Sequence, residues 1–221
     1  MNAIVNFVTT IPIENIHPFE DNPYKVQDNE EMQTLCKSIR ENGVLSPLLV
    51  RKIDAAEEYE VISGHRRLYA AQKLGLTELP TVTTDLDRSA AAIALVDSNL
   101  HREHILPSEK ALAYKLKMEA LSHQGAACGQ AGHKSRDAVS DTDSGRQVQR
   151  YIRLTYLIPE LLNKLDTGEI ALSVGVELSY LDEQRQRDVL EQCEINDCTP
   201  SYLQAVLPQG LNAAETEDYV I

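Results

Sequence analysis

Residues 61–75 read VISGHRRLYAAQKLG, which begins as an apolar strand and ends as an amphipathic helix. At the change from one to the other stand Gly64, His65, Arg66 and Arg67. The backbone N–H groups of a first helical turn have no partners inside the helix, and the helix dipole adds partial positive charge there. Glycine lets a ligand approach that backbone closely, and arginines add charge-assisted hydrogen bonds. The segment therefore predicts a site for a phosphate-bearing ligand.

The two arginines also have a structural explanation, which the residues alone leave open. The acidic residues Glu57, Glu58 and Glu60 stand just before this segment and could neutralise the arginines within the chain. In that case the arginines would be ordinary ion-pair partners, and the phosphate site would not exist.

Strand and helix patterns alternate on both sides of this segment up to about residue 95. Strands are expected at 11–16, 44–53, 59–63 and 79–86, and helices at 30–42 and 65–75. Beyond them the patterns are all helical, at 90–99, 108–123, 135–141, 144–156, 159–166, 171–180 and 183–193, with a glycine-rich linker at 124–135. We therefore predict an α+β chain, with a mixed α/β domain over 1–98, an all-α helix-turn-helix domain over 99–206 and an acidic flexible tail over 207–221.

Composition points to a cytoplasmic protein without a membrane partner. No window of the 221 residues approaches the roughly 18 to 20 apolar residues that cross a bilayer. The first residues lack the basic region and the cleavage site of a signal peptide. The four cysteines form no C-x-x-C pair, which predicts reduced thiols. His123, Cys128 and His133 lack a fourth ligand, so a zinc site is not expected.

The net charge of −13 argues at first against a nucleic-acid partner. Phosphate contacts depend on local patches, however, and positive charge is concentrated in three places. These are Arg51-Lys52, Arg66-Arg67 and the stretch 146–153. An acidic chain with a basic face is the expected result.

The third basic stretch lies in SRDAVSDTDSGRQVQRYIRLTYL, residues 135–157, which has the pattern of a helix-turn-helix. A recognition helix reads the major groove with its N-terminal part, where arginine suits guanine and glutamine suits adenine. We expect Arg146, Gln147, Gln149 and Arg150 to face the bases and Arg153 to contact a phosphate. A solvated amphipathic helix in an ordinary bundle is the alternative.

Residues on either side of this helix raise two further points. Asp137, Asp141 and Asp143 place negative charge where phosphates would pass, so they either weaken DNA binding or cap helices and point away. A set of apolar residues after the helix is expected to pack against it rather than touch DNA: Tyr156, Leu157, Ile158, Leu161, Leu162 and Leu165.

Several segments together resemble the ParB-type partition proteins. SGHRRLYAAQKLG resembles the family's G-E-R-R-x-x-A box, and NGVLSPLLVRK resembles its G-x-x-x-P-L-x-V-R strand entry. ALVDSNLHREHILPSEKALAY resembles the E-N-x-Q-R-x-x-L-x-P-x-E-x-A segment, and NPYKV stands at the family's nucleobase-side loop. LIPELLNKLDTGEIALSVGVELSYL resembles the segment that follows the recognition helix, so the likeness extends over about the first 190 residues.

The resemblance implies a ParB/sulfiredoxin-like first domain that binds CTP and Mg²⁺ and thereby switches a DNA-binding module. Gly64, His65, Arg66 and Arg67 would then hold phosphates, and Arg102 would close over them. Asn99 would lie near the metal, with the Asp97 carboxylate reaching it through water. The implied partner is double-stranded DNA with a centromere-like or operator site, bound by a homodimer associated with the nucleoid.

Departures from the family pattern bear on the chemistry. His65 replaces the glutamate of the arginine box, Ser98 separates the acid from Asn99, and His101 stands where glutamine is usual. CTP hydrolysis is therefore expected to be slow or absent. Gly64 stands where sulfiredoxin-type enzymes carry their nucleophilic cysteine, so that reaction is not expected.

Two alternatives remain besides a CTP-switched partition protein. One is an enzyme on the same fold, a nuclease or a nucleotide-dependent kinase, although no clustered carboxylates for two-metal cleavage are evident. The other is a transcriptional regulator whose nucleotide pocket has decayed. The sequence after Cys193 is too short for an independent dimerisation domain. The first 16 residues hold no Lys or Arg, so a partition ATPase is not an expected partner.

Overall fold

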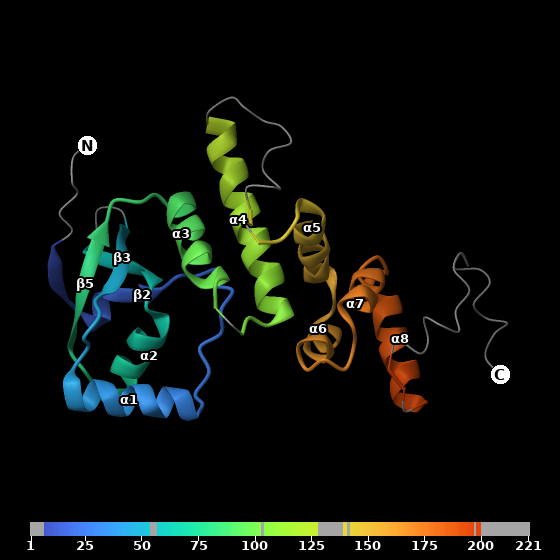
Figure 1. Ribbon diagram of the computed structural model, residues 1–221, viewed down its shortest axis with the longest axis horizontal. Helices are drawn as coiled ribbons and strands as arrows, with labels where there is room; N and C mark the ends of the chain where they lie inside the picture. Colours follow the sequence, from blue (N-terminus) through green and yellow to red (C-terminus); the bar gives the residue numbers. More distant parts are fainter. Residues whose placement is uncertain are drawn as a thin grey trace. The chain divides into compact units, whose positions relative to one another are not determined.

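The computed structural model describes residues 7–53, 57–102, 104–127, 139–140, 142–196 and 198–199 (Figure 1). The chain divides into two compact units, one made of residues 1–105 and 113–139 and the other of residues 106–112 and 140–221. Helix α4 (Pro107–Ala127) supplies residues to both units. No helix of the described residues is long and apolar enough to cross a membrane.

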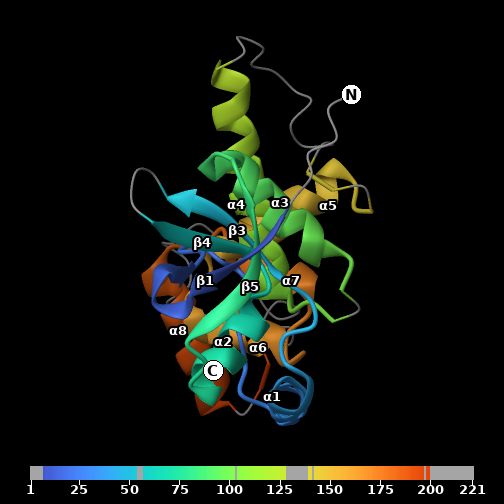
Figure 2. The same ribbon diagram turned by 90° about the vertical axis from the view of Figure 1, so that its left-hand side faces the viewer.

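The first unit is built on a five-stranded mixed sheet of order β1-β5-β3-β4-β2 (Figure 2). The β1–β5 and β3–β4 pairs are antiparallel, whereas the β3–β5 and β2–β4 pairs are parallel. A single 3-10 turn, Ile13–Asn15, separates the first two strands, so the strand expected at 11–16 is two shorter ones. The strands are β1 (Val8–Pro12), β2 (Ile16–Pro18), β3 (Leu48–Ile53), β4 (Glu58–Ser63) and β5 (Glu78–Thr84).

Helices cover both faces of the sheet. Consecutive strand residues point to opposite faces, so the buried neighbours Val61 and Ile62 of β4 belong to different cores. Val61 packs with Leu68 of α2 (His65–Leu74), and Ile62 packs with Leu95 of α3 (Arg88–Leu100). Helix α1 (Glu30–Asn42) lies against α2. The predicted mixed α/β fold of this part is confirmed.

The second unit is helical, as predicted. It contains α5 (Gly145–Arg153), the 3-10 turn Leu154–Tyr156, α6 (Pro159–Asp166), α7 (Leu172–Leu178) and α8 (Glu183–Ile195), together with the start of α4. Its core gathers Leu154, Leu157, Leu161 and Leu165 around Ala111. The Asp166 carboxylate accepts hydrogen bonds from the Ser108 N–H at 2.9 Å and from the Ser108 hydroxyl, which fixes the first turn of α4.

Three expectations from the sequence need comment. Residues 124–127 of the expected linker are helical, because α4 continues to Ala127, and the rest of that linker lies outside the described residues. Most of the helix expected at 135–141 lies outside the described residues, and Val139 and Ser140 are not helical. Cys36, Cys193 and Cys198 are in no disulfide, whereas Cys128, His133 and the tail from 207 lie outside the described residues.

Candidate functional site

Gly64 makes the turn from β4 into α2 in a conformation that requires glycine. Its φ is 113° and its ψ is 18°, and no side chain caps the helix that follows. A Cβ placed on Gly64 would lie 2.9 Å from Leu48 Cγ and 3.1 Å from Arg67 Nη2. Because no side chain caps α2, none competes with a ligand for the first-turn amides of this helix.

The two arginines of this turn have different environments. Arg67 Nη1 donates to the carbonyls of Ser46 and Pro47 at 2.5 and 2.8 Å, and burial lowers the pKa of its guanidinium. Arg66 Nη2 lies 3.0 Å from the Glu31 carboxylate, in a pair with exposed fractions of 41% and 72%. Arg67 therefore fastens the segment that enters β3, whereas the weak surface pair leaves Arg66 able to exchange partners.

The acidic run expected as the alternative partner of these arginines binds elsewhere. Glu60 lies 2.7 Å from Arg51 Nε, and Glu58 lies 3.9 Å from His17. Among the contacts of the described residues, neither glutamate pairs with Arg66 or Arg67.

His65 is a neutral hydrogen-bond acceptor at the first position of α2. Its Nε2 accepts the N–H of Phe19 at 3.3 Å, which places the imidazole proton on Nδ1. Burial, reinforced by the positive charge of Arg102, lowers the pKa of His65 to about 4. At neutral pH this residue therefore brings neither a positive nor a negative charge to the site.

A small cavity of about 230 Å³ opens beside His65. Every second residue of the NPYKV segment lines it, namely Asn22, Tyr24 and Val26, and we call it the NPYKV cavity. The Asn22 side chain closes this turn on the backbone of Tyr24, with contacts of 3.1 and 3.2 Å. The Arg102 guanidinium stacks 5.5 Å from the centre of the Tyr24 ring. The structure thus brings Arg102, the NPYKV segment and the start of α2 together.

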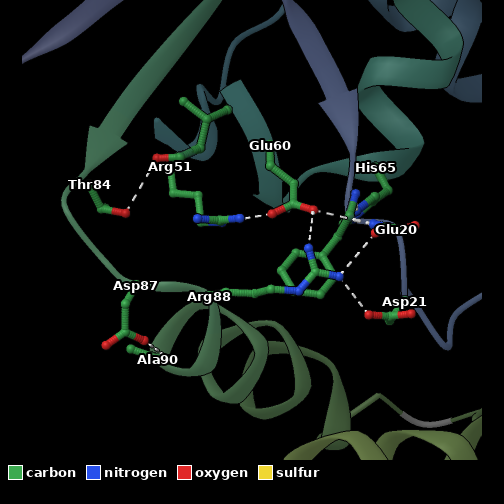
Figure 3. A network of polar contacts seen from close by, with 11 residues as sticks. Glu20, Asp21, Arg51, Glu60, His65, Thr84, Asp87, Arg88 and Ala90 are labelled. Atoms are coloured by element: carbon green, nitrogen blue, oxygen red, sulfur yellow. Dashed lines mark hydrogen bonds and ion pairs between the residues drawn. The ribbon is translucent and has the colours of Figure 1, made fainter. Parts of the chain in front are cut away.

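An ion network around the buried Glu60, which the sequence patterns did not reveal, holds the segment between β2 and α1. The Glu60 carboxylate contacts Arg51 on the neighbouring strand and accepts the N–H of Glu20 at 3.4 Å (Figure 3). Arg88 lies 2.7 Å from Asp21 and 3.8 Å from Glu60, and the hydrogen bond to Asp21 raises the pKa of Arg88. The only signal in the sequence was the opposite charge of Arg51 and Glu60 on two expected neighbouring strands; their pairing in the register of β3 and β4 is seen in the structure.

The residues expected at a metal do not converge. Residues two apart on an α-helix point about 200° apart, so Asp97 and Asn99 lie on opposite sides of α3. Asn99 is buried and its Nδ2 donates to the Leu95 carbonyl at 2.7 Å, whereas Asp97 is exposed and lies 2.6 Å from Lys117 Nζ. No group of three His, Cys, Asp or Glu suited to a metal occurs within the described part of the chain. This donor set does not fit a magnesium ion held by Asp97 and Asn99.

In the second unit, α5 has the form of a recognition helix. Ser144 caps it by accepting the Gln147 N–H at 3.3 Å, and Val148 and Ile152 are buried. Arg146 is exposed, and Arg150 reaches Gln147 Oε1 at 3.3 Å. Together with the partly exposed Gln149, these residues form the polar side of the helix.

The acid nearest α5 is neutralised. Lys110 Nζ lies 2.6 Å from Asp143 and 4.7 Å from the centre of the Tyr151 ring, and both charges are largely buried. Asp143 therefore brings little net negative charge to the start of the helix. Asp137 and Asp141 lie outside the described residues.

Arg153 is held differently from the other basic residues of α5. Its guanidinium donates to the Ser179 carbonyl at 2.7 Å and to the Ser179 hydroxyl at 3.2 Å, and it lies 4.6 and 4.2 Å from the ring centres of Tyr156 and Tyr180. Tyr156 is 61% exposed, and its ring stacks on Arg153 of α5, so it contacts that helix at the surface rather than in the core. Of the other residues expected to pack there, Leu157, Ile158, Leu161 and Leu165 are buried and Leu162 is partly buried.

Comparison with known proteins identifies related sequences. Residues 2–100 match the model of the ParB N-terminal domain. The probable chromosome 1-partitioning protein ParB of Deinococcus radiodurans is 36% identical over 212 residues, which cover 95% of this chain and 64% of that protein. A nucleoid occlusion protein of Geobacillus thermodenitrificans is 30% identical over 216 residues, which cover 97% of this chain and 68% of that protein. The chain thus spans about two thirds of the length of these relatives.

Solved structures include one that shares the fold of this chain. A ParB-N domain described as Pnob8-like matches with a TM-score of 0.54 and 18% identity, covering 91% of this chain and 88% of that one, which shows a shared fold. The C-terminally truncated ParB of Caulobacter crescentus, complexed with CTP-γ-S, is 29% identical and covers 84% of this chain and 98% of that one, with a TM-score of 0.40. From its sequence relatives and its fold, the chain belongs to the ParB family of partition proteins.

Proposed function

We propose that this chain is a partition-type DNA-binding protein whose first unit binds CTP and whose second unit binds a specific duplex site. Nucleotide binding would switch the DNA-bound state. The observation that carries the proposal is the uncapped start of α2, with Arg66, Arg102 and the NPYKV cavity around it. Such a site offers amides and guanidinium groups to phosphates and a partly apolar cavity to a base.

The phosphates would bind through a simple exchange. The Glu31 carboxylate forms a surface ion pair with Arg66, and a phosphate group would replace the carboxylate in that pair. Arg102, above the Tyr24 ring, would contact the same polyphosphate while the base enters the NPYKV cavity. In this arrangement Gly64 and Arg66 bind phosphate, whereas His65 and Arg67 hold the surrounding backbone in place.

The DNA would be read by the first turns of α5. Arg146, Gln147, Gln149 and Arg150 are the proposed base contacts, and the Lys110–Asp143 pair removes the nearby negative charge that would repel phosphates. Arg153, held between two tyrosines, would present its remaining N–H groups to a phosphate beside the base contacts. A homodimer would place two α5 helices on the two halves of a symmetric site.

Nucleotide binding tests the first half of the proposal. Isothermal titration should show CTP binding more tightly than ATP or GTP. Arg66→Ala should weaken CTP about 10- to 150-fold, the range expected for losing hydrogen bonds to a charged group. Arg40→Ala, which removes an exposed arginine in the last turn of α1, is the matched control and should leave the affinity unchanged. Failure to bind any nucleotide, with specific DNA binding intact, would instead support the regulator with a decayed pocket.

Site selection from random duplexes tests the second half. Arg150→Ala should cost about 1 to 3 kcal/mol at one base position and relax the preference there. Selection of no preferred site would count against specific DNA binding. Metal-dependent nicking of supercoiled DNA that Asp97→Ala abolishes would favour the nuclease alternative over this proposal.

A further inference from the structure

Several carboxylates on the elements around the start of α2 are engaged by basic side chains. Five acids from the β2–α1 segment, α1, β4 and α3 lie within 3.2 Å of a basic nitrogen. They are Glu20 and Asp21 with Arg88, Glu31 with Arg66, Glu60 with Arg51, and Asp97 with Lys117. Mg²⁺ in a nucleotide site is usually held by one or two carboxylates in addition to the substrate phosphates and water. None of these five acids is available for that task without breaking an ion pair.

Asp97, which is the one of these five acids on α3, is firmly held by its ion pair with Lys117. The side chain of its partner Lys117 is only 10% exposed. Moving the carboxylate away would leave a buried ammonium unpaired, which is strongly destabilising. Asp97 also lies on the side of α3 away from Asn99, so even a free carboxylate would not approach the amide.

His65 contributes no metal ligand either. Its Nε2 already accepts the Phe19 N–H, and its low pKa reflects a buried neutral ring rather than an anion. Asn99 can therefore offer one neutral amide oxygen, while its Nδ2 remains bonded to the Leu95 carbonyl. One neutral oxygen is a poor site for a hard dication, which requires close-packed oxygen ligands.

We infer that this pocket binds its nucleotide as the metal-free polyphosphate, with the charge matched by Arg66, Arg102 and the amides of α2 instead of a protein-held Mg²⁺. The inference rests on the proposed nucleotide binding and specifies the chemical form of the ligand. Guanidinium groups and helix amides can neutralise a phosphate chain without a metal, because each makes charge-assisted hydrogen bonds to its oxygens.

The test compares CTP affinity of the full chain in excess EDTA and in saturating Mg²⁺. The two dissociation constants should agree within about threefold, far less than the tenfold or greater change expected where a carboxylate holds the ion. Tight binding only in Mg²⁺ would overturn the inference and leave the proposed function standing. Absence of CTP binding under both conditions would overturn the proposed function, and the inference with it.

A designed variant tests whether the lack of a carboxylate beside Asn99 is the reason for metal-free binding. Ser98 is exposed, and its hydroxyl lies 3.1 Å from Asn99 Nδ2, so Ser98→Glu places an unpaired carboxylate beside that amide. This variant should bind CTP at least about tenfold more tightly in Mg²⁺ than in EDTA. Ser122→Glu, which adds the same charge at an exposed position of α4, is the matched control and should behave like the parent chain. A Ser98→Glu protein indifferent to Mg²⁺ would contradict the argument that the missing carboxylate is the cause.

Discussion

Replacing Gly64 with alanine should damage the first unit through two separable effects. A non-glycine residue in left-handed backbone geometry costs about 1 to 2 kcal/mol. The new Cβ would also lie 2.9 Å from Leu48 Cγ, in a side chain with no exposed surface, and 3.1 Å from Arg67 Nη2. Arg67 cannot yield cheaply, since its guanidinium is bonded to the carbonyls of Ser46 and Pro47. Overpacking of this kind costs a further 1 to 3 kcal/mol or so, which gives a total of about 2 to 5 kcal/mol.

Gly75→Ala provides the matched control for this substitution. Gly75 has a φ of 71°, and nothing lies within 4 Å of a Cβ built there, so alanine should cause the conformational cost alone. Hydrogen exchange of the β3 and β4 amides in a urea series would measure the stability of the first unit in both variants. We expect Gly64→Ala to lower the free energy of unfolding by about 1 to 3 kcal/mol more than Gly75→Ala does. Equal losses in the two variants would refute the steric argument.

Three further predictions address single contacts. Glu31→Gln removes the competitor of the phosphates at Arg66, so CTP should bind about 1.4- to 5-fold more tightly in a titration, as expected for an exposed ion pair, and weaker binding would contradict the exchange. His65 has a folded-state pKa of about 4 against 6.5 when unfolded, so the unfolded chain takes up the proton first on acidification. The stability that the neutral ring contributes should therefore be complete about one pH unit above 6.5 and fall as the pH drops towards 4, by about 1.4 kcal/mol at pH 5.5, and a His65→Gln chain showing the same fall in urea titrations would rule out this origin. Lys110→Met removes the ammonium that lies 2.6 Å from the Asp143 carboxylate, so it should lower the free energy of unfolding by about 1 to 3 kcal/mol and weaken DNA binding in a fluorescence anisotropy assay; unchanged values would show that the pair is dispensable.

The sequence predicted the elements that local rules determine. Asn29, Gly43, Gly75 and Ser144 lie at helix ends as their capping preferences require, and the apolar spacing of Met32, Cys36 and Ile39 gave α1 correctly. Periodicity also separated the mixed first part from the helical second part. These features depend on a few consecutive residues, which is why a single sequence reveals them.

Contacts between distant residues were harder to predict. The Glu60 network joins residues from β3, β4, α3 and the segment between β2 and α1, and neither helical nor strand periodicity indicates such contacts. The spacing of Asp97 and Asn99 already indicated that they cannot meet at one ion, because residues two apart on a helix point to opposite sides. The ion pair of Asp97 with Lys117 was not predictable in this way, because Lys117 is 20 positions away. Tyr156 was expected to pack against α5 together with its apolar neighbours, and its contact with that helix is made at the surface by the charged Arg153.

The strand order also bears on how the chain folds during synthesis. Val8 of β1 pairs with Val82 of β5, so the N-terminal strand must wait for about 70 more residues before its neighbour exists. At ordinary translation speeds this delay is about 4 to 15 s. The β3–β4 hairpin can form earlier from adjacent chain, but the other edge of β3 stays unpaired until β5, which ends at Thr84, has been synthesised. Slow codons in the stretch that encodes α2 would prolong that exposure.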